Sequence, residues 1–187
     1  SITDCHVKGR IQLIAGQYAG GIVGIYEGNY TNGKILAACT VQAEGGSITG
    51  GAYQGAGCIV GSVGQYSYVI GCIAHDITLS IQQNASLAAI AGVNSGLIYC
   101  CLMYNCQADN TYNTGAVTHR MNYCYYYNVF EQSDQYMKSS LEELSEDSFI
   151  HDLNRYIEDL GLFACHYKAS PTPSETGPTI HMKYYYE

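Results

Sequence analysis

The sequence is short of several residue types that common folds and functions require. It has no tryptophan and three prolines, and Asp, Glu, Lys and Arg make up 13% of its 187 residues, against roughly 25% in an average globular protein. The eight Lys and Arg residues form no cluster, which argues against a phosphate-binding surface and therefore against a nucleic-acid partner. No apolar run approaches the roughly 18 residues that span a bilayer, so no transmembrane segment is expected.

Glycine and tyrosine are abundant instead, with 21 and 19 residues. Tyrosine suits the pleated surface of strands and glycine suits tight corners, so the composition favours a β-rich fold over a helical bundle. The net charge of −8 is unevenly distributed, because more than half of the sixteen acidic residues fall between positions 131 and 159. This change in composition divides the chain into a nearly neutral part, 1–130, and an acidic part, 131–187.

The nearly neutral part contains an internal repeat of about 30 residues. Four segments have the pattern aliphatic-x-x-Cys-x-apolar: 2–7, 36–41, 69–74 and 98–103. A second pattern, Gly-Gly-Ile-Val-Gly in its clearest copy, lies between them at 20–24, 57–61 and 88–92, with a weaker copy at 114–118. Two patterns that recur in the same phase predict a repeat architecture.

Each repeat holds three short apolar stretches, separated by corners rich in glycine and asparagine. Strands this short are stable only when the same strand of the next repeat stacks about 4.8 Å away and extends one shared core. Crossovers between parallel strands are normally right-handed. We therefore expect an all-β fold over 1–130, a right-handed parallel β-helix that forms a three-sided β-solenoid of about four coils. A leucine-rich-repeat horseshoe is the rival, but its leucine spacing and helical segment are missing.

Residues 131–187 are expected to form a C-terminal cap, because an open solenoid end exposes unpaired strand edges that invite aggregation. A helix is predicted over about 140–160, since Ser140 and Glu143 have capping-box spacing. An apolar stripe at helical spacing follows them: Phe149, Leu153, Ile157 and Leu160. We expect this stripe to cover the last coil.

The end of the chain completes the predicted cap. Gly161 would end the helix in a left-handed conformation. Residues 170–178, which contain all three prolines, are predicted as a loop, and 179–186 as a closing strand. At the opposite end, Ser1 falls within the first expected strand, so we expect the chain to be a piece of a longer protein.

The two patterns resemble the GLUG repeat, found in secreted and surface proteins of bacteria, including gut species and some large IgA-peptidase-like adhesins. The resemblance covers residues 1–122 and departs from the pattern at Ala88, Ala89 and Thr118. It implies an extracellular or outer-surface location, where a lipid anchor could precede the chain. The resemblance implies no catalytic mechanism and brings no functional residues with it.

Nine cysteines would normally suggest a disulfide framework in a secreted protein. The repeat predicts another role for four of them, an inward-facing ladder of Cys5, Cys39, Cys72 and Cys101. Parallel Cβ vectors hold neighbouring Cβ atoms further apart than the ~3.8 Å of a disulfide, and thiols along a line cannot converge on zinc. We expect free, packed thiols, with one or more bridges as the alternative, for which Cys100 and Cys106 are the candidates.

Parallel β-helices host polysaccharide lyases and glycosidases, so the outer positions beside the cysteines test for an enzyme. Period 2 places Asp4 and His6 outside in the first repeat, but no carboxylate occupies the same positions in the next two repeats. Glycoside hydrolysis needs two carboxylates within about 5–9.5 Å. Asp4 and His6 could hold a weakly bound metal, but Lys8 opposes a cation. We predict a solvated strand face with no catalytic residue, no metal and no cofactor.

Tyrosines near the corners are the candidate ligand-binding residues: Tyr18, Tyr53, Tyr66 and Tyr68. An exposed row of tyrosines could stack on sugar rings or press against a protein, although tyrosine also fills the surface of charge-poor β proteins.

The sequence therefore predicts a monomeric, non-enzymatic binding, adhesion or scaffold module of the bacterial cell surface, whose partner is a glycan or a surface protein of host or bacterium. Two alternatives stay open. One is an enzyme that acts on polysaccharides, a lyase or glycosidase on the same fold. The other is a purely structural spacer within a larger surface protein.

Overall fold

The structure is a computed structural model that describes residues 1–43, 47–81, 86–108, 121–130, 136–161 and 165–182, with the side chains of 13–15 and 47–53 left aside. Over these residues the protein is mostly β, with two helices near the C-terminus. The strands form three sheets in which every pair is parallel, and one antiparallel pair. The chain runs through the three sheets in turn and then returns to the first, and we call each such circuit a pass.

The first sheet stacks one strand from every pass. Its order is β1 (Ile2–Thr3), β5 (Lys34–Ala37), β9 (Ser67–Ile70), β13 (Leu97–Tyr99) and β15 (Met121–Asn122). The register places like over like, because Leu36 pairs with both Ile2 and Val69, and Ile98 pairs with both Val69 and Met121. These are the aliphatic residues that open the cysteine pattern, and Leu36, Val69 and Ile98 are fully buried.

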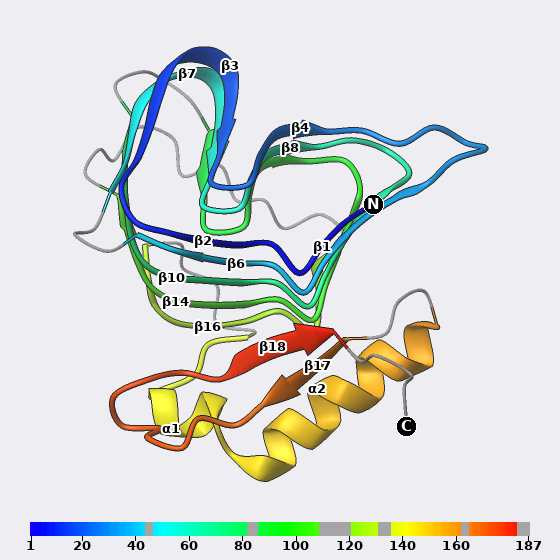
Figure 1. Cartoon of the computed structure of the whole chain (residues 1–187), viewed down its shortest axis with the longest axis vertical. Helices are drawn as coiled ribbons and strands as arrows, with labels where there is room; N and C mark the ends of the chain where they lie inside the picture. Colours follow the sequence, from blue (N-terminus) through cyan, green and yellow to red (C-terminus); the bar gives the residue numbers. More distant parts are fainter. Residues whose placement is uncertain (44–46, 82–85, 109–120, 131–135, 162–164, 183–187) are drawn as a thin grey trace.

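The second sheet continues each pass after the cysteine. Its strands are β2 (His6–Lys8), β6 (Thr40–Gln42), β10 (Ile73–Ile81), β14 (Leu102–Ala108) and β16 (Tyr125–Val129), joined by β3 (Ile11–Gly20), β7 (Ser47–Gly57) and β11 (Ser86–Ala88). Figure 1 shows β2, β6, β10, β14 and β16 as successive parallel lines, and β3 and β7 bending over and returning toward the third sheet. That third sheet contains β4 (Val23–Tyr26), β8 (Val60–Val63) and β12 (Ala91–Asn94).

The corner between the first and second sheets is the same in every pass. The residue before each stacked cysteine has a φ between 50° and 55°, in the left-handed region: Asp4, Ala38, Gly71, Cys100 and Tyr123. Four of the five carry a side chain, for which this conformation costs about 1 kcal/mol or more. The corner turns the following cysteine toward the core, so the packing of that thiol helps to offset the strain.

The glycine pattern marks the place where the chain turns from the second sheet into the third. A Cβ atom at Gly61 would lie 2.5 Å from the backbone nitrogen of Ala19 and 2.5 Å from the carbonyl oxygen of Gly24. One at Gly92 would lie 2.2 Å from the nitrogen of Ala56. Neighbouring backbones approach so closely here that only glycine fits, which is the physical reason for the second sequence pattern.

A second left-handed corner divides the second sheet. It holds Asp76, Asn105 and Asn128, whose φ values lie between 49° and 53°. The side-chain amide of Asn105 donates to the Asp76 carboxylate at 3.0 Å, and that of Asn128 donates to the Asn105 side-chain oxygen at 3.0 Å. His75 Nδ1 lies 2.8 Å from the other Asp76 oxygen. Hydrogen bonds from His75 and Asn105 lower the pKa of Asp76, so this short ladder keeps its charge at neutral pH.

The cysteine pattern occurs once more than the four copies found in the sequence. Its fifth copy spans 121–126, where Met121 stacks on Ile98 and Cys124 follows Tyr123 in the same left-handed corner. Parallel stacking therefore continues through β16. The weaker glycine copy predicted at 114–118 lies outside the described residues.

The cap consists of two helices and the antiparallel pair. Its elements are α1 (Leu141–Leu144), α2 (Asp147–Leu160), β17 (Cys165–Lys168) and β18 (Thr179–Met182). Ser140 Oγ accepts the Glu143 N–H at 3.2 Å, as the capping-box spacing predicts. The predicted single helix is wrong, because α1 ends at Leu144 with Ser145 as its C-cap, and α2 begins at Asp147. Gly161 ends α2 with a φ of 64°, as expected. The sequence did not predict β17, and of the predicted closing strand 179–182 is described.

The cap covers more of the sheets than the last coil that the sequence predicted. Three α2 residues, Ile150, Leu153 and Ile157, are buried in an apolar cluster on the outer side of the first and second sheets. The sheet residues of that cluster come from three passes: Ala37, Ala38, Ile70, Ile73, Cys100, Leu102 and Tyr104. Of the predicted stripe, Phe149 and Leu160 are half-buried. The outer face is itself apolar, so α2 packs along several passes. Its contacts include the last described pass, where Phe149 lies edge to face with Tyr125 and Tyr156 stacks on Tyr123, with ring centroids 4.8 and 3.9 Å apart. Figure 1 shows the cap next to β16, the last of these strands.

A short segment, residues 136–138, pairs with the edge of β16, the last described strand of the second sheet. The N–H of Tyr126 in β16 donates to the carbonyl of Tyr136 at 3.2 Å, and the Lys138 N–H donates to the carbonyl of Tyr126 at 2.8 Å. These two hydrogen bonds form a parallel bridge and satisfy backbone groups at the edge of β16. This segment therefore helps to protect the strand edge from aggregation, a role that the sequence analysis expected of the helix.

Candidate functional site

The four predicted ladder cysteines lie in one column with a fifth, Cys124. The backbone N–H of Cys72 donates to Sγ of Cys101 at 3.5 Å, and the N–H of Cys101 donates to Sγ of Cys124 at 3.4 Å. The thiols of Cys39, Cys72, Cys101 and Cys124 each donate to the carbonyl two residues earlier, at 3.2 to 3.6 Å. The sulfurs of Cys101 and Cys124 therefore each accept the N–H of the stacked cysteine in the previous pass. Sequence reasoning could have found Cys124, since 121–126 has the same pattern.

All nine cysteines are free, and every one except the half-exposed Cys5 is buried. Burial raises the pKa of Cys72 and of Cys124, and it raises the pKa of Cys165, in the cap, to about 12. The nucleophilic form of cysteine is the thiolate. The column has a structural role, because its sulfurs are packed in the core and hydrogen-bonded to the backbone.

Asp4 and His6 lie together on the exposed side of the first pass. His6 Nε2 is 3.1 Å from Asp4 Oδ1, and both side chains are well exposed. Within the described part of the chain, no three His, Cys, Asp or Glu side chains gather closely enough to hold a metal ion. The pair is therefore an exposed hydrogen bond on a strand face.

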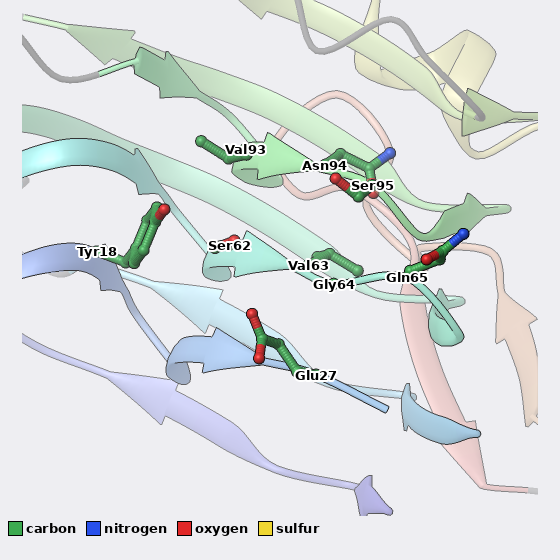
Figure 2. A pocket seen from close by; sticks show the side chains of 9 residues that line it. All are labelled: Tyr18, Glu27, Ser62, Val63, Gly64, Gln65, Val93, Asn94 and Ser95. Atoms are coloured by element: carbon green, nitrogen blue, oxygen red, sulfur yellow. The ribbon is translucent and has the colours of Figure 1, made fainter. Parts of the chain in front are cut away.

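A groove of about 620 Å³ lies along the third sheet and crosses three passes. The first pass contributes Tyr18 and Glu27, the second contributes 62–65, and the third contributes 93–95. Figure 2 shows Glu27 reaching toward Ser62, with Tyr18 to one side and the third pass beyond. Six side chains supply its polar groups: Tyr18, Glu27, Ser62, Gln65, Asn94 and Ser95. Hydroxyl, amide and carboxylate groups beside an aromatic ring are typical of a polar ligand site.

The fold fixes Tyr18 at one end of this groove. Tyr18 lies on the returning arm of β3 and pairs with Gly55 in the next pass. Since glycine has no side chain, nothing stacks on the tyrosine from that position. The Tyr18 hydroxyl donates to the side-chain oxygen of Gln54, and this bond sets the direction of the ring. An aromatic side chain held in this way costs little entropy when a ligand binds.

Two more tyrosines lie beyond the strand ends at the other end of the groove. Tyr30 sits in the loop between β4 and β5 and is 84% exposed, and Tyr66 follows Gln65 of the groove and is 40% exposed. Their rings meet edge to face with centroids 5.8 Å apart. Sequence reasoning missed Tyr30, although the flanking asparagines and glycine at 29–33 read as a turn that would expose it. Figure 1 shows this loop projecting furthest from the strands.

The predicted tyrosine set is therefore divided. Tyr18 lines the groove and Tyr66 lies next to it. Tyr68 is half-buried, packs against the apolar cluster under the cap and does not line the groove, and its ring lies beside Gly33 of the Tyr30 loop. Tyr53 lies in β7, and its side chain lies outside those that the structure describes.

The groove has few charged groups, and comparisons with known proteins add no relative. The residues that line the groove include one carboxylate, Glu27, and no Lys or Arg. No helix in the described residues is long and apolar enough to cross a membrane. No protein-family model, no curated protein and no solved structure shows a significant match to this chain.

Proposed function

We propose that this chain is a non-enzymatic, glycan-binding module of a secreted or cell-surface bacterial protein. The observation that carries the proposal is the groove, which combines an oriented tyrosine with hydroxyl, amide and carboxylate groups from three successive passes. Sugars offer many hydroxyl groups and an apolar ring face. The polar groups of the groove match the hydroxyls, and the ring of Tyr18 matches the sugar face.

The proposed architecture is a right-handed parallel β-helix of GLUG-like repeats. The like-over-like register of the first sheet supports it, because Leu36, Val69 and Ile98 occupy equivalent places in successive passes. The cysteine column supports it in the same way. A stack of this kind is stiff, and its corner loops present side chains at regular intervals, which suits a module that displays binding contacts.

A binding role fits the groove better than catalysis does. Glycoside hydrolysis uses two carboxylates within about 5–9.5 Å, and the groove lining offers Glu27 alone. The carboxylate oxygens of Glu27 can accept hydrogen bonds from sugar hydroxyls. We propose that the module acts as a monomer, outside the cell or on its outer surface, with a surface glycan as its partner.

The test is a glycan array run beside a depolymerisation assay on the same polysaccharides. The proposal expects selective binding to one or a few glycans, with no new reducing ends and no unsaturated products. Product formation would instead establish the polysaccharide-active enzyme. Failure to bind any glycan would favour the structural spacer.

A further inference from the structure

We propose that the groove and the Tyr30–Tyr66 pair form one continuous surface for a single linear, uncharged glycan chain. This inference rests on the proposed glycan-binding function and names the class of glycan and the second contact area. The Tyr30–Tyr66 pair is called the aromatic platform below.

The aromatic platform is held in place before any ligand arrives. Asn29 and Asn32 exchange two backbone hydrogen bonds, at 3.2 and 3.1 Å, and close a tight turn around Tyr30. The Asn29 side-chain oxygen also accepts from the Asn32 N–H at 2.7 Å and from the Thr31 hydroxyl at 3.0 Å. A loop built only to connect two strands has no need to hold an exposed aromatic ring so firmly, whereas a binding surface gains affinity from such rigidity.

Tyr66 adds a second sign of a special role. Its φ is 65°, in the left-handed region where a tyrosine is strained. The surrounding backbone enforces this conformation, because the Tyr66 carbonyl accepts the Lys34 N–H at 3.1 Å. Glycine or asparagine would take this position at lower cost, so the aromatic ring is retained where the backbone disfavours it. Other left-handed residues of the protein form the repeated corners between strands. Tyr66 differs from most of them because its ring is 40% exposed and meets a second exposed ring, Tyr30.

The aromatic platform and the groove are joined through the same two loops. Glu27 lines the groove and lies three residues before Tyr30, and Gln65 lines it immediately before Tyr66. The loops touch, since a Cβ atom at Gly28 would lie 2.4 Å from the Tyr66 carbonyl oxygen. A ligand that leaves the groove at its Glu27 end therefore meets the aromatic platform next.

The shape of this surface favours a linear chain over a single sugar. The long direction of the surface follows the strands of the third sheet. The four residues of β4 span about 13 Å at the usual rise per residue, and the aromatic platform lies beyond the ends of β4 and β8. Tyr18 at one end and the aromatic platform at the other offer aromatic contacts that sugar rings far apart along one chain can use.

The charge of this surface favours an uncharged chain. Glu27 lies within the groove, and no Lys or Arg lines it to neutralise the carboxylate of a uronic acid or a sulfate ester. A polyanion would place like charges side by side in a partly desolvated groove, and that arrangement is unfavourable. Neutral hydroxyl groups can donate hydrogen bonds to Glu27 without this cost.

Isothermal titration calorimetry on the full chain tests the inference. The probes are linear hexasaccharides of glucose, mannose or xylose, with oligogalacturonate as the acidic probe. Tyr30→Ala and Tyr66→Asn, which keeps a residue suited to the left-handed backbone, should each weaken binding of the preferred neutral probe about three- to tenfold. Tyr18→Ala should weaken it by a similar factor. Met137→Ala, an exposed side chain near the last strand, serves as the control and should leave binding unchanged.

Glu27→Gln separates charge from shape. Because the amide keeps the size of the side chain, the affinity for the neutral probe should change less than threefold and oligogalacturonate should begin to bind. Neutral binding that is insensitive to Tyr30→Ala and Tyr66→Asn would overturn the inference and leave the glycan-binding function standing. Preference of the unmodified chain for oligogalacturonate would overturn it as well. Binding of no probe, together with an empty glycan array, would refute the function itself.

Discussion

The backbone N–H of Cys101 donates to the sulfur of Cys124 one pass further along, at a distance of 3.4 Å. The same contact joins Cys72 to Cys101 at 3.5 Å. In both places a left-handed corner precedes the donating cysteine, and the thiol of the next pass accepts its N–H. The repeated cysteine therefore satisfies a buried backbone donor as well as filling space, which gives a physical reason for cysteine rather than alanine or valine at this position.

Cys101→Ala should lower the free energy of unfolding by about 1–3 kcal/mol, because it leaves the buried Cys72 N–H without its acceptor. Urea denaturation followed by circular dichroism measures the change. Cys106→Ala is the matched control. That thiol is equally buried, but its sulfur donates hydrogen bonds to the carbonyls of Ala74 and Tyr104. Equal losses in the two variants would show that the column contributes packing alone.

Gly61→Ala should prevent folding or cost about 4 kcal/mol or more, because the new methyl group would lie 2.5 Å from backbone atoms of Ala19 and Gly24. Backbone atoms of two passes cannot move apart here without opening the sheets. Gly16→Ala is the control, since the nearest atom to a Cβ atom there is 3.5 Å away. Thermal melting of both variants distinguishes them, and a Gly61→Ala protein that melts like the parent would contradict the close approach at this corner.

Stability should fall as the pH rises above about 9. Burial raises the pKa of Cys165 from 9.0 to about 12 in the folded protein. The unfolded chain therefore releases this proton first, so the stabilisation is complete below pH 9 and is lost as the pH rises toward 12. Each such thiol contributes a slope of about −1.4 kcal/mol per pH unit in that window.

Urea titrations at pH 8, 9 and 10 measure this slope. Cys165→Ala should make the fall in the free energy of unfolding with pH less steep, by the contribution of one thiol, about 1.4 kcal/mol per pH unit. A stability that does not change between pH 8 and 10 would mean that the thiols are not shielded from water in the folded protein.

Leu153→Ala should loosen the cap, because this fully buried side chain joins α2 to the outer face of the sheets. The expected cost is about 2–5 kcal/mol. Hydrogen exchange should show loss of protection in α2, β17 and β18 with little change in β10 and β14. Leu160→Ala, at a half-buried position, should have a smaller effect. An equal loss of protection in every strand would show that cap and sheets unfold as one unit.

The repeat was predictable because its cause is local and recurs at each pass. The pattern spans only six positions and includes the aliphatic residue, the left-handed corner and the cysteine. The first copy, residues 2–7, therefore shows every feature that the later copies repeat. The close backbone approach at Gly61 and Gly92 likewise appears in the sequence as glycine at a fixed phase. Parallel stacking in three sheets follows from these patterns.

The full surface that the cap covers was not predictable from the helical stripe. The stripe shows that α2 packs against an apolar surface, but it does not show which residues form that surface. The sequence did carry a signal for the partner. The segments 35–39 and 69–74 are apolar without alternation, and continuous apolar runs are typical of strands buried on both faces. Leu36 faces the inner core while Ala37 and Ala38 face the cap.

The groove depends on contacts between passes that no single repeat contains. Tyr18 and Glu27 lie in the first pass, and Asn94 and Ser95 in the third. Their proximity follows from the stacking register and from the return of β3 toward β4, which a pattern of apolar residues does not specify. Tyrosine content pointed to Tyr18 and Tyr66, but composition does not separate these from the half-buried Tyr68.

The most direct test of the central claim is a titration of the isotopically labelled chain with the preferred neutral hexasaccharide, followed by backbone amide NMR shifts. Glycan binding at the groove predicts that the largest shift changes fall on residues 18, 27, 30, 62–66 and 93–95, with the amides of α2 and β17 unaffected. Largest changes on the cap or on the outer face of β10 and β14, or no changes at saturating glycan, would contradict the account.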